Sequence, residues 1–270
     1  MDSRETQCIN IQKIVEHIKN ASRKTCCAIE VLDDTPGTLD NKIGGVPYLP
    51  VGEPFPTDSN GNPMSLLLQI RCRDINLPEF PDEGVLEIFV SSSLTALPFE
   101  CTVKLFPENL PFQILSPQPA NKDDIIIVKN YPRGHKILVS HQPSYISVWD
   151  FRFEYFLADA LSEVLHVSLP KNLDVSEFFP DVPNANEVLL NSFPSDCHIS
   201  IGGYPDFTQD DPRPSKKCPK NLTTCLFKLD SIYNMKLFNI GDAGILCVFI
   251  SDEDLAACNF SGAVAEWDCC

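Results

Sequence analysis

The chain contains an internal repeat, and this repeat limits the possible folds more than any other feature. Three short blocks recur in the same order: IGGVP at 43–47 and IGGYP at 201–205, LLLQI at 66–70 and CLFKL at 225–229, and GVLEIFVS at 84–91 and GILCVFIS at 244–251. The paired blocks lie 158, 159 and 160 residues apart. Because three anchors at nearly constant spacing rarely arise by chance, we expect one domain over 1–270, made of halves 9–150 and 151–270.

The first block predicts a tight bend before a strand. Glycine tolerates a positive φ angle, and the residue before a proline favours extended backbone. The residues of this motif are Gly44, Gly45, Pro47, Gly202, Gly203 and Pro205. The other two blocks are apolar at almost every position, which is typical of strands buried on both faces. We therefore expect a strand-rich α+β fold, in which a duplication arranges two halves with pseudo-twofold symmetry around a shared core.

Local patterns predict further elements around these strands. A helix capped by Asn10, a second over 153–165 and a third capped by Ser251 follow from apolar periodicity and capping residues. Additional strands are predicted at 101–106, 125–131, 136–140, 145–149 and 262–268. We expect these helices to flank the sheet.

The charge of the chain excludes several classes of partner. With 37 acidic and 21 basic residues, the formal net charge is -16. Such a surface repels nucleic-acid phosphates and acidic membranes. The longest near-continuous apolar run, 243–250, is too short to cross a bilayer. We therefore expect neither nucleic acid nor membrane among the partners.

The 12 cysteines are expected to be mostly buried, reduced thiols. No CxxC pair occurs, so the spacing typical of a structural zinc site is missing, and we expect no bound metal. The polar residues 1–7 show no features of a secretory leader. The expected location is the cytoplasm, where thiols stay reduced. Cys269 and Cys270 are interpreted as the end of a terminal strand, and prenylation of this pair is the alternative.

Several of these segments resemble the YwqG-like family of uncharacterised proteins. The residues that carry the resemblance are KIGGVP at 42–47, DSNGNPM at 58–64, LQI at 68–70, IGGYPDFTQDDPR at 201–213, GDAG at 241–244, FS at 260–261 and WDC at 267–269. The likeness spans roughly residues 10–270. It implies a cytoplasmic, internally duplicated α+β protein and no known activity. This chain has Ile240 where the family tends to have tryptophan.

Common catalytic motifs are missing from the sequence, so candidate site residues come from weaker patterns. The chain has no GxSxG, HExxH, GxGxxG or phosphate-binding loop. Carboxylates near a guanidinium could bind a polar ligand or act as acid and base, or could fix a loop by ion pairing. The candidates of this kind are Asp206, Asp210, Asp211, Arg213, Asp230 and Asp242. Arg133 and His135 belong to the basic segment 131–136, which is interpreted as a contact for an acidic partner or as a solvated hairpin tip.

Three hypotheses of function follow. The leading one is a non-catalytic binding protein without a cofactor, which uses loops at the pseudo-twofold cleft to bind a protein or a small polar ligand. The second is a hydrolase or isomerase of a small substrate, using the Asp206–Arg213 loop with Asp230 or Asp242. The third is a protein that neutralises a toxin by direct binding.

Overall fold

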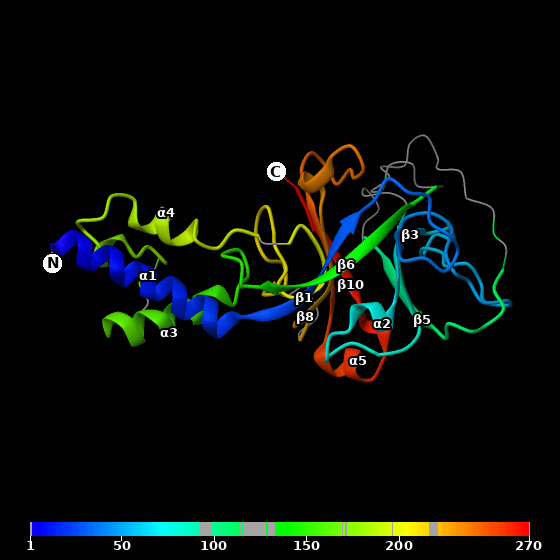
Figure 1. The fold of residues 1–270 in the computed structure, drawn as a ribbon, viewed down its shortest axis with the longest axis horizontal. Helices are drawn as coiled ribbons and strands as arrows, with labels where there is room; N and C mark the ends of the chain where they lie inside the picture. The colour runs from blue at the N-terminus through cyan, green and yellow to red at the C-terminus, as the bar shows by residue number, and fades with distance from the viewer. Residues whose placement is uncertain are drawn as a thin grey trace.

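The computed structural model is a strand-rich α+β protein, with a sheet body and a helical lobe (Figure 1). The structure describes residues 2–91, 99–113, 115, 128, 133–168, 170, 172–195, 197–215 and 221–269. Its helices are α1 (Ser3–Ser22), α2 (Cys72–Ile75), α3 (Phe153–Leu165), α4 (Ala185–Leu190) and α5 (Asp252–Ala256), with the 3-10 helices η1 (Ser176–Phe178), η2 (Ser231–Asn234) and η3 (Phe260–Gly262). Its strands are β1 (Lys24–Val31), β2 (Lys42–Ile43), β3 (Ser65–Arg71), β4 (Val85–Val90), β5 (Cys101–Phe106), β6 (His135–Ser144), β7 (Ile199–Gly202), β8 (Thr224–Asp230), β9 (Ile245–Ile250) and β10 (Val264–Asp268).

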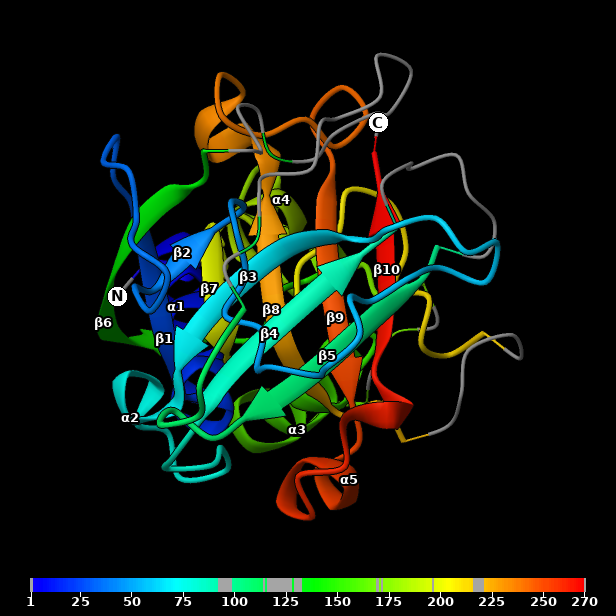
Figure 2. The ribbon, with the colours of Figure 1, turned by 90° about the vertical axis from the view of Figure 1, so that its right-hand side faces the viewer.

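All ten strands of the described residues form a single antiparallel sheet. The strand order is β10-β9-β8-β7-β1-β6-β2-β3-β4-β5. Figure 2 shows the sheet curling, so that β2–β5 cross in front of β7–β10. This curvature lets two parts of one sheet face each other and enclose a core.

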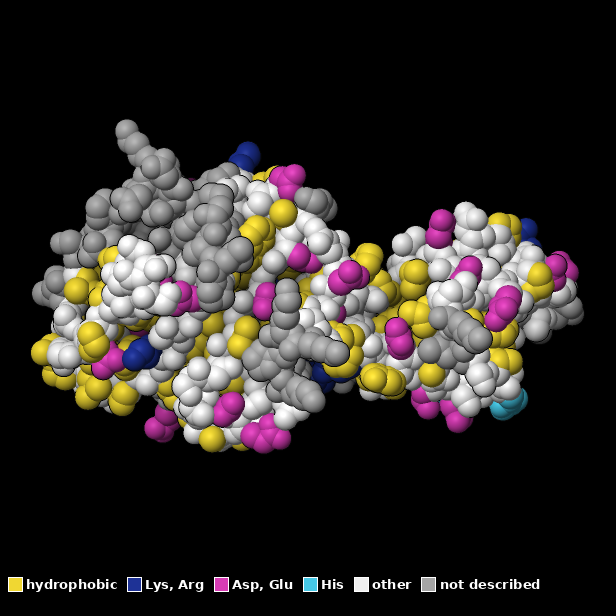
Figure 3. All heavy atoms as spheres, turned by 180° about the vertical axis from the view of Figure 1, so that it is seen from behind, with side chains coloured by type: hydrophobic (Ala, Val, Ile, Leu, Met, Phe, Trp, Pro, Cys, Tyr) yellow, Lys and Arg dark blue, Asp and Glu magenta, His cyan; other side chains and the backbone are white. Residues whose placement is uncertain are grey.

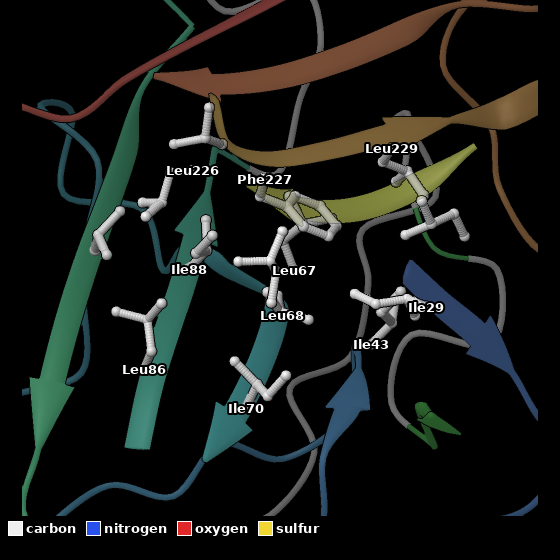
Figure 4. Close-up of a cluster of buried hydrophobic side chains, with 14 of the residues drawn as sticks. Ile29, Ile43, Leu67, Leu68, Ile70, Leu86, Ile88, Leu226, Phe227 and Leu229 are labelled. Carbon is white, nitrogen blue, oxygen red and sulfur yellow. The ribbon is translucent and has the colours of Figure 1, made fainter. Parts of the chain in front are cut away.

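The main core lies between these two facing parts of the sheet. Side chains of β3 and β4 on one side and of β8 and β9 on the other belong to the same buried cluster (Figure 4). Every residue of β4 and of β9 is buried. The expectation that both strands are buried on both faces is confirmed, because loops cover the faces that point away from the core.

Matching β-bulges interrupt β3 and β8. The pairing register shifts between Leu66 and Leu68 in β3 and between Cys225 and Phe227 in β8. A bulge turns consecutive residues toward the same face of a sheet. Accordingly, Leu67 and Leu68 both enter the main core, and so do Leu226 and Phe227.

The strand order reads the same way inward from either edge of the sheet. The order β5-β4-β3-β2 at one edge corresponds to β10-β9-β8-β7 at the other, and β6 and β1 pair at the centre. β2 pairs with β6 through Ile43 and His135, while β7 pairs with β1 through Ile201 and Cys27. We call β1–β5 the first part of the sheet and β6–β10 the second part. The first strand of each part, β1 or β6, thus pairs with the short second strand of the other part, β7 or β2.

The helical lobe lies to one side of the sheet and has its own core. Helices α1, α3 and α4 project together from one end of the body (Figure 1). Their apolar faces form a cluster separate from the main core, centred on Ile14, Leu157 and Leu189. The expectation that the predicted helices flank the sheet is therefore wrong for α1 and α3, and α4 was not predicted. Among the described residues, no helix has both the length and the apolar character needed to span a membrane.

Several predicted boundaries differ from the structure. Helix α1 begins at Ser3, so Asn10 is not its cap. Ser3 and Gln7 hydrogen-bond to Asp181, and these tertiary contacts fix the first turns. Residues 145–149 form no strand, because β1, the partner of β6, begins at Lys24 opposite Ser144.

Other predicted elements are confirmed. The strand at 101–106 and the helix at 153–165 match β5 and α3. Ser251 caps α5 by accepting a hydrogen bond from the Asp254 N–H. Most of the strand predicted at 125–131 lies outside the described residues, as does Cys270.

Candidate functional site

The loop after β7 covers the outer face of the second part of the sheet. Residues 203–215 contain Phe207, which joins Cys225, Cys247 and Phe249 in a small apolar cluster on that face. The Phe207 and Phe249 rings stack with their centroids 6.2 Å apart. The loop is therefore a packed part of the structure rather than a free surface segment.

Arg213 holds this loop in place through buried ion pairs. Its Nη2 lies 2.5 Å from Asp211 Oδ2 and 2.9 Å from Asp150 Oδ2, and all three side chains are buried. The guanidinium also lies 5.0 Å from the ring centroids of Phe151 and Phe249. The Phe207 ring centroid lies 5.9 Å from it. Two carboxylates and three aromatic rings thus engage this cation, which gives it a structural role in holding the loop to the sheet.

The charges of this ion network are mutually stabilised. Burial opposes the charge of Arg213, but the hydrogen bonds and the negative charges of Asp211 and Asp150 outweigh it and raise the pKa of Arg213. Burial likewise opposes ionisation of Asp150, while Arg152 and Arg213 outweigh it and lower the pKa of Asp150. These groups are ionised at neutral pH, as expected for a structural cluster.

The other predicted aspartates lie in different places. Asp206 accepts a hydrogen bond of 2.6 Å from the Ser147 hydroxyl. Asp230 lies 2.8 Å from His198 Nδ1 and accepts a hydrogen bond from the N–H of Ile232 at the start of η2. Asp242 is exposed before β9. The structure thus brings Asp211 together with Arg213, while none of the other four aspartates forms an ion pair with this arginine among the described residues.

A small cavity, here called the acidic pocket, opens between the 203–215 loop and β10. Its volume is about 60 Å³. The lining residues are Phe207, Asp210, Pro212, Ile245, Cys247, Glu266, Trp267 and Asp268. Three of them are carboxylates and none is basic. Among the described residues, no group of three or more His, Cys, Asp or Glu side chains is arranged to hold a metal ion.

Asp268 links the pocket to the loop backbone. Its Oδ2 accepts hydrogen bonds of 2.8 Å from the N–H groups of Thr208 and Gln209. Its Oδ1 and the Thr208 hydroxyl are buried and have no hydrogen-bond partner within the described part of the chain. Burial raises the pKa of the neighbouring Glu266. The pocket region therefore contains hydrogen-bond acceptors without a partner among the described residues. Beside them lies Glu266, whose ionisation is disfavoured by burial.

Segment 241–244 packs against the end of β10 beside this pocket. A Cβ on Gly241 would lie 2.7 Å from Cys269 Cβ, and one on Gly244 would lie 2.3 Å from the Asp268 carbonyl oxygen. Only glycine permits such close approach of two backbones. The motifs at 201–213, 241–244 and 267–269, which are distant in sequence, therefore meet in one region.

The basic segment and the glycine bends lie near the centre of the sheet. Arg133 donates to Thr35 and to the Asp33 carbonyl, and His135 is buried in β6. Tyr131 and Pro132 lie outside the described residues. All four motif glycines have positive φ angles between 67° and 80°, which confirms the predicted bends. The prediction that each bend comes before a strand is wrong, because the bends follow β2 and β7 and lead into loops that contain Pro47 and Pro205.

Two larger hollows lie elsewhere. One, of about 750 Å³, lies beside β5 and contains the ion pair of Arg73 and Glu108. The other, of about 580 Å³, lies between α1 and α4 in the helical lobe and is lined mainly by apolar side chains. The residues that line each of these three hollows come from one part of the molecule. None of the three is therefore a cleft between the two parts of the sheet.

Sequence reasoning missed two important residues of this region, Asp150 and Glu266. Asp150 pairs with Arg213 across 63 positions of sequence, which no local motif indicates. Glu266 precedes the Trp267-Asp268 motif and lies on a strand that was predicted. The alternation of side chains along a strand would have placed Glu266 and Asp268 on the same face.

The fold and the site define a class: a strand-rich α+β protein with one curled antiparallel sheet, a separate helical lobe and a small acid-lined pocket. The chain belongs to the family described as Domain of unknown function (DUF1963), whose model matches residues 41–269. The match includes nine of the ten strands and begins after α1 and β1. No curated protein matches the chain.

Proposed function

We propose that this protein is a non-catalytic binding protein whose acidic pocket receives a cationic group of its partner. The observation that carries the proposal is the lining of the pocket, which contains Asp210, Glu266 and Asp268 and, among the described residues, no lysine or arginine. The partner is a protein or a small polar molecule that presents an ammonium or guanidinium group. The net charge of -16 favours such partners over anionic ones.

The chemistry of the pocket walls supports a cationic ligand. Phe207 and Trp267 offer aromatic surface, and aromatic rings attract ammonium and guanidinium groups through their negative faces. The volume of about 60 Å³ suits a side-chain-sized group, whereas whole drug-sized ligands occupy about 300 Å³ or more. A donor reaching Asp268 Oδ1 would also satisfy an acceptor that is otherwise unpaired among the described residues.

The first part of the sheet has apolar and basic side chains at the equivalent positions. Val85 pairs with Phe106 as Ile245 pairs with Asp268, so Phe106 corresponds to Asp268 and Lys104 corresponds to Glu266. Phe106 packs into an apolar cluster with Tyr48, and Lys104 forms a 3.0 Å ion pair with Glu53. Of these two equivalent faces, the second has the acid-lined pocket.

This comparison is part of a wider proposal, that the chain arose by internal duplication and has pseudo-twofold symmetry. Support comes from the mirrored strand order, the two bulges at equivalent positions and the glycine pairs with positive φ angles. We also propose that the family assignment extends to the YwqG-like group and that the protein is cytoplasmic. Support for the latter comes from fully buried cysteines, such as Cys72 and Cys225, which pack as small apolar side chains.

The two other hypotheses have less support. An enzyme using the Asp206–Arg213 loop would need its carboxylates to converge, yet Asp211 is engaged by Arg213 and Asp230 by His198. Binding and neutralising a toxin is compatible with an acidic surface, but the structure offers no feature specific to it.

Calorimetry with small cations tests the proposed pocket. The probe is N-acetyl-arginine amide, and N-acetyl-citrulline amide serves as its neutral analogue of similar shape. We expect the arginine compound to bind and the citrulline compound not to bind. The double variant Asp210→Asn, Glu266→Gln should weaken binding at least about tenfold, because two of the three carboxylates lose their charge.

Asp242→Asn is the matched control. Asp242 is also exposed and also near β9, but it does not line the pocket. This variant should bind the arginine compound like the unaltered protein. Equal binding of the arginine and citrulline compounds, or equal losses in the pocket and control variants, would refute the proposed site.

A further inference from the structure

Two buried cysteines from distant parts of the chain meet at the base of the helical lobe. The Sγ atoms of Cys26 and Cys197 lie 3.2 Å apart, and the two residues are 0% and 7% exposed. A disulfide has an S–S length of about 2.05 Å, so the sulfurs need to approach by only about 1 Å to form one. Gln142 Oε1 lies 3.7 Å from Cys197 Sγ and completes a small polar cluster.

This cluster lies where the chain passes between the lobe and the sheet. Cys26 is in β1, four residues after the end of α1, and Cys197 lies between α4 and β7. Gln142 is the register partner of Cys26 on β6, the strand that leads toward α3. All three connections between lobe and sheet therefore contribute a residue. Figures 1 and 3 show that the molecule narrows between the lobe and the sheet body.

We propose that Cys26 and Cys197 are a reversible oxidation site, at which a peroxide converts the two thiols into a disulfide that ties the lobe to the sheet. In the first step the Cys197 thiolate attacks one peroxide oxygen. The O–O bond breaks, hydroxide leaves and Cys197 becomes a sulfenic acid. In the second step the Cys26 sulfur attacks Cys197 Sγ. The S–O bond breaks, the S–S bond forms, and the oxygen leaves as water with the proton of Cys26.

Hydrogen peroxide is the oxidant that accepts the two electrons released when the disulfide forms. The proton that Cys197 lost neutralises the hydroxide, so two thiols are oxidised and one hydrogen peroxide is reduced to two waters. A thiol such as glutathione or dithiothreitol reverses the bond by exchange. The only reagents required are thus a peroxide and a reducing thiol.

The order of the two steps follows from the environment of each sulfur. The hydrogen bond with Cys197 and burial raise the pKa of Cys26, so Cys26 keeps its proton until the second step. Lys228 Nζ lies 3.1 Å from Ser195 Oγ, two residues before Cys197, and places a positive charge near the pair. Cys197 is also the more exposed residue of the two, at 7% against 0% for Cys26. It is therefore the one that a peroxide reaches first.

A second thiol pair provides an internal comparison. Cys225 and Cys247 also influence each other's ionisation, but both are fully buried on adjacent strands beneath the 203–215 loop. Cys225 is 0% and Cys247 1% exposed, against 7% for Cys197. We therefore expect oxidation to select the pair at the lobe.

Peptide mapping of the reduced, full-length protein tests the proposal. After brief treatment with hydrogen peroxide, remaining thiols are alkylated and the digest is analysed by mass spectrometry. We expect a linked peptide containing Cys26 and Cys197, loss of two of the 12 alkylatable thiols, and recovery of both with dithiothreitol. Both cysteines remaining fully alkylatable, or a different linked pair forming first, would overturn the proposal.

Two variants separate the roles of the sulfurs. In Cys26→Ser, Cys197 should accumulate as a sulfenic acid that dimedone traps, because the second thiol is missing. In Cys197→Ser, Cys26 should stay reduced and give no dimedone adduct. Cys8→Ser, which removes an exposed cysteine on α1, is the control and should form the Cys26–Cys197 bond normally. If either variant fails to fold, the mapping of the unaltered protein still decides the proposal.

Discussion

Glu87 is a fully buried carboxyl group in the first part of the sheet. Its Oε1 accepts a hydrogen bond of 2.8 Å from the N–H of Tyr48, while its Oε2 has no hydrogen-bond partner among the described residues. Burial raises the pKa of Glu87 to about 8, against the opposing influence of Tyr48 and Lys42. Lys42 is itself buried and donates to the carbonyl oxygens of Gly37 and Thr38. These buried polar groups hold a loop rather than forming an open site.

The raised pKa of Glu87 predicts a specific pH dependence of stability. Between about pH 4.5 and 8 the folded state keeps a proton on Glu87 that the unfolded state has released, so this group makes stability fall as pH rises. Glu87→Gln removes this contribution. The stability of the variant relative to the unaltered protein should therefore rise by about 3 kcal/mol from pH 5 to pH 8, measured by urea unfolding.

Glu163→Gln provides the control for this measurement. Glu163 is exposed on α3, so its substitution should change stability equally at both pH values. A pH-independent difference between the Glu87 variant and the unaltered protein would contradict the assigned role of Glu87.

At the residue scale, the sequence predicted which residues are special better than it predicted their partners. Asp211 and Arg213 were singled out because opposite charges stood close together in the chain. Asp150, the other partner of Arg213, comes from a loop that only the folded sheet brings near. Pairing across such distances depends on strand order, which local sequence patterns do not contain.

The second glycine bend, which follows β7, packs tightly against the two central strands β1 and β6. Gly203 has a φ angle of +75°, and a Cβ there would lie 2.7 Å from Ser144 Oγ and 2.8 Å from Cys26 Cβ. The neighbouring Tyr204 N–H donates to the same Ser144 hydroxyl. An added methyl group would thus strain the backbone and also push the bend away from Cys26 in β1 and Ser144 in β6.

Substitution of two glycines by alanine distinguishes these effects. Gly61 has a similar φ angle of +81° but no atom within 4 Å of its would-be Cβ. Gly61→Ala should therefore cost about 1 kcal/mol, from backbone strain alone. Gly203→Ala should cost about 3 kcal/mol or more, because steric overlap adds to the strain. Thermal unfolding measures both, and equal losses would show that the contacts around Gly203 are easily relieved.

At the element scale, strands and helix caps with strong local signals were predicted well. β5 and α3 match their predicted ranges, and Ser251 caps α5 as expected. Errors arose where tertiary contacts decide the boundary. Hydrogen bonds to Asp181 fix the first turns of α1. β6 ends at Ser144 because its partner strand β1 begins at Lys24, so residue 145 has no strand residue opposite it.

The two parts of the sheet share one core, so we expect them to unfold as one cooperative unit. Leu68 from β3 and Leu226 and Phe227 from β8 belong to the same buried cluster (Figure 4). A cavity made in the first part should therefore destabilise the second part too. Leu68→Ala should cost about 2–5 kcal/mol, the usual range for a buried leucine.

Fluorescence of Trp267 reports this coupling. The chain has two tryptophans, and Trp149→Phe leaves only Trp267, which lies on β10 in the second part. In that background, Leu68→Ala should lower the unfolding midpoint seen by Trp267. An unchanged Trp267 midpoint, with loss of structure detected elsewhere by circular dichroism, would show that the two parts unfold independently.

At the scale of the whole molecule, the repeat predicted two related sets of strands but not their connection. The sequence indicated buried strands in both halves, and these strands share the main core. The separate helical lobe was not predicted, because an amphipathic helix buries its apolar face equally well against a sheet or against other helices. The choice depends on packing surfaces that come together only after folding.

The central position of β1 has a consequence for how the protein is made. β1 ends at Val31, but its two neighbours, β6 and β7, begin at His135 and Ile199. During synthesis on the ribosome, β2 to β5 can pair among themselves, while β1 waits for more than a hundred further residues to emerge. The nascent chain therefore carries an unpaired strand edge for most of its translation, and the sheet becomes continuous only when β6 and β7 have left the exit tunnel.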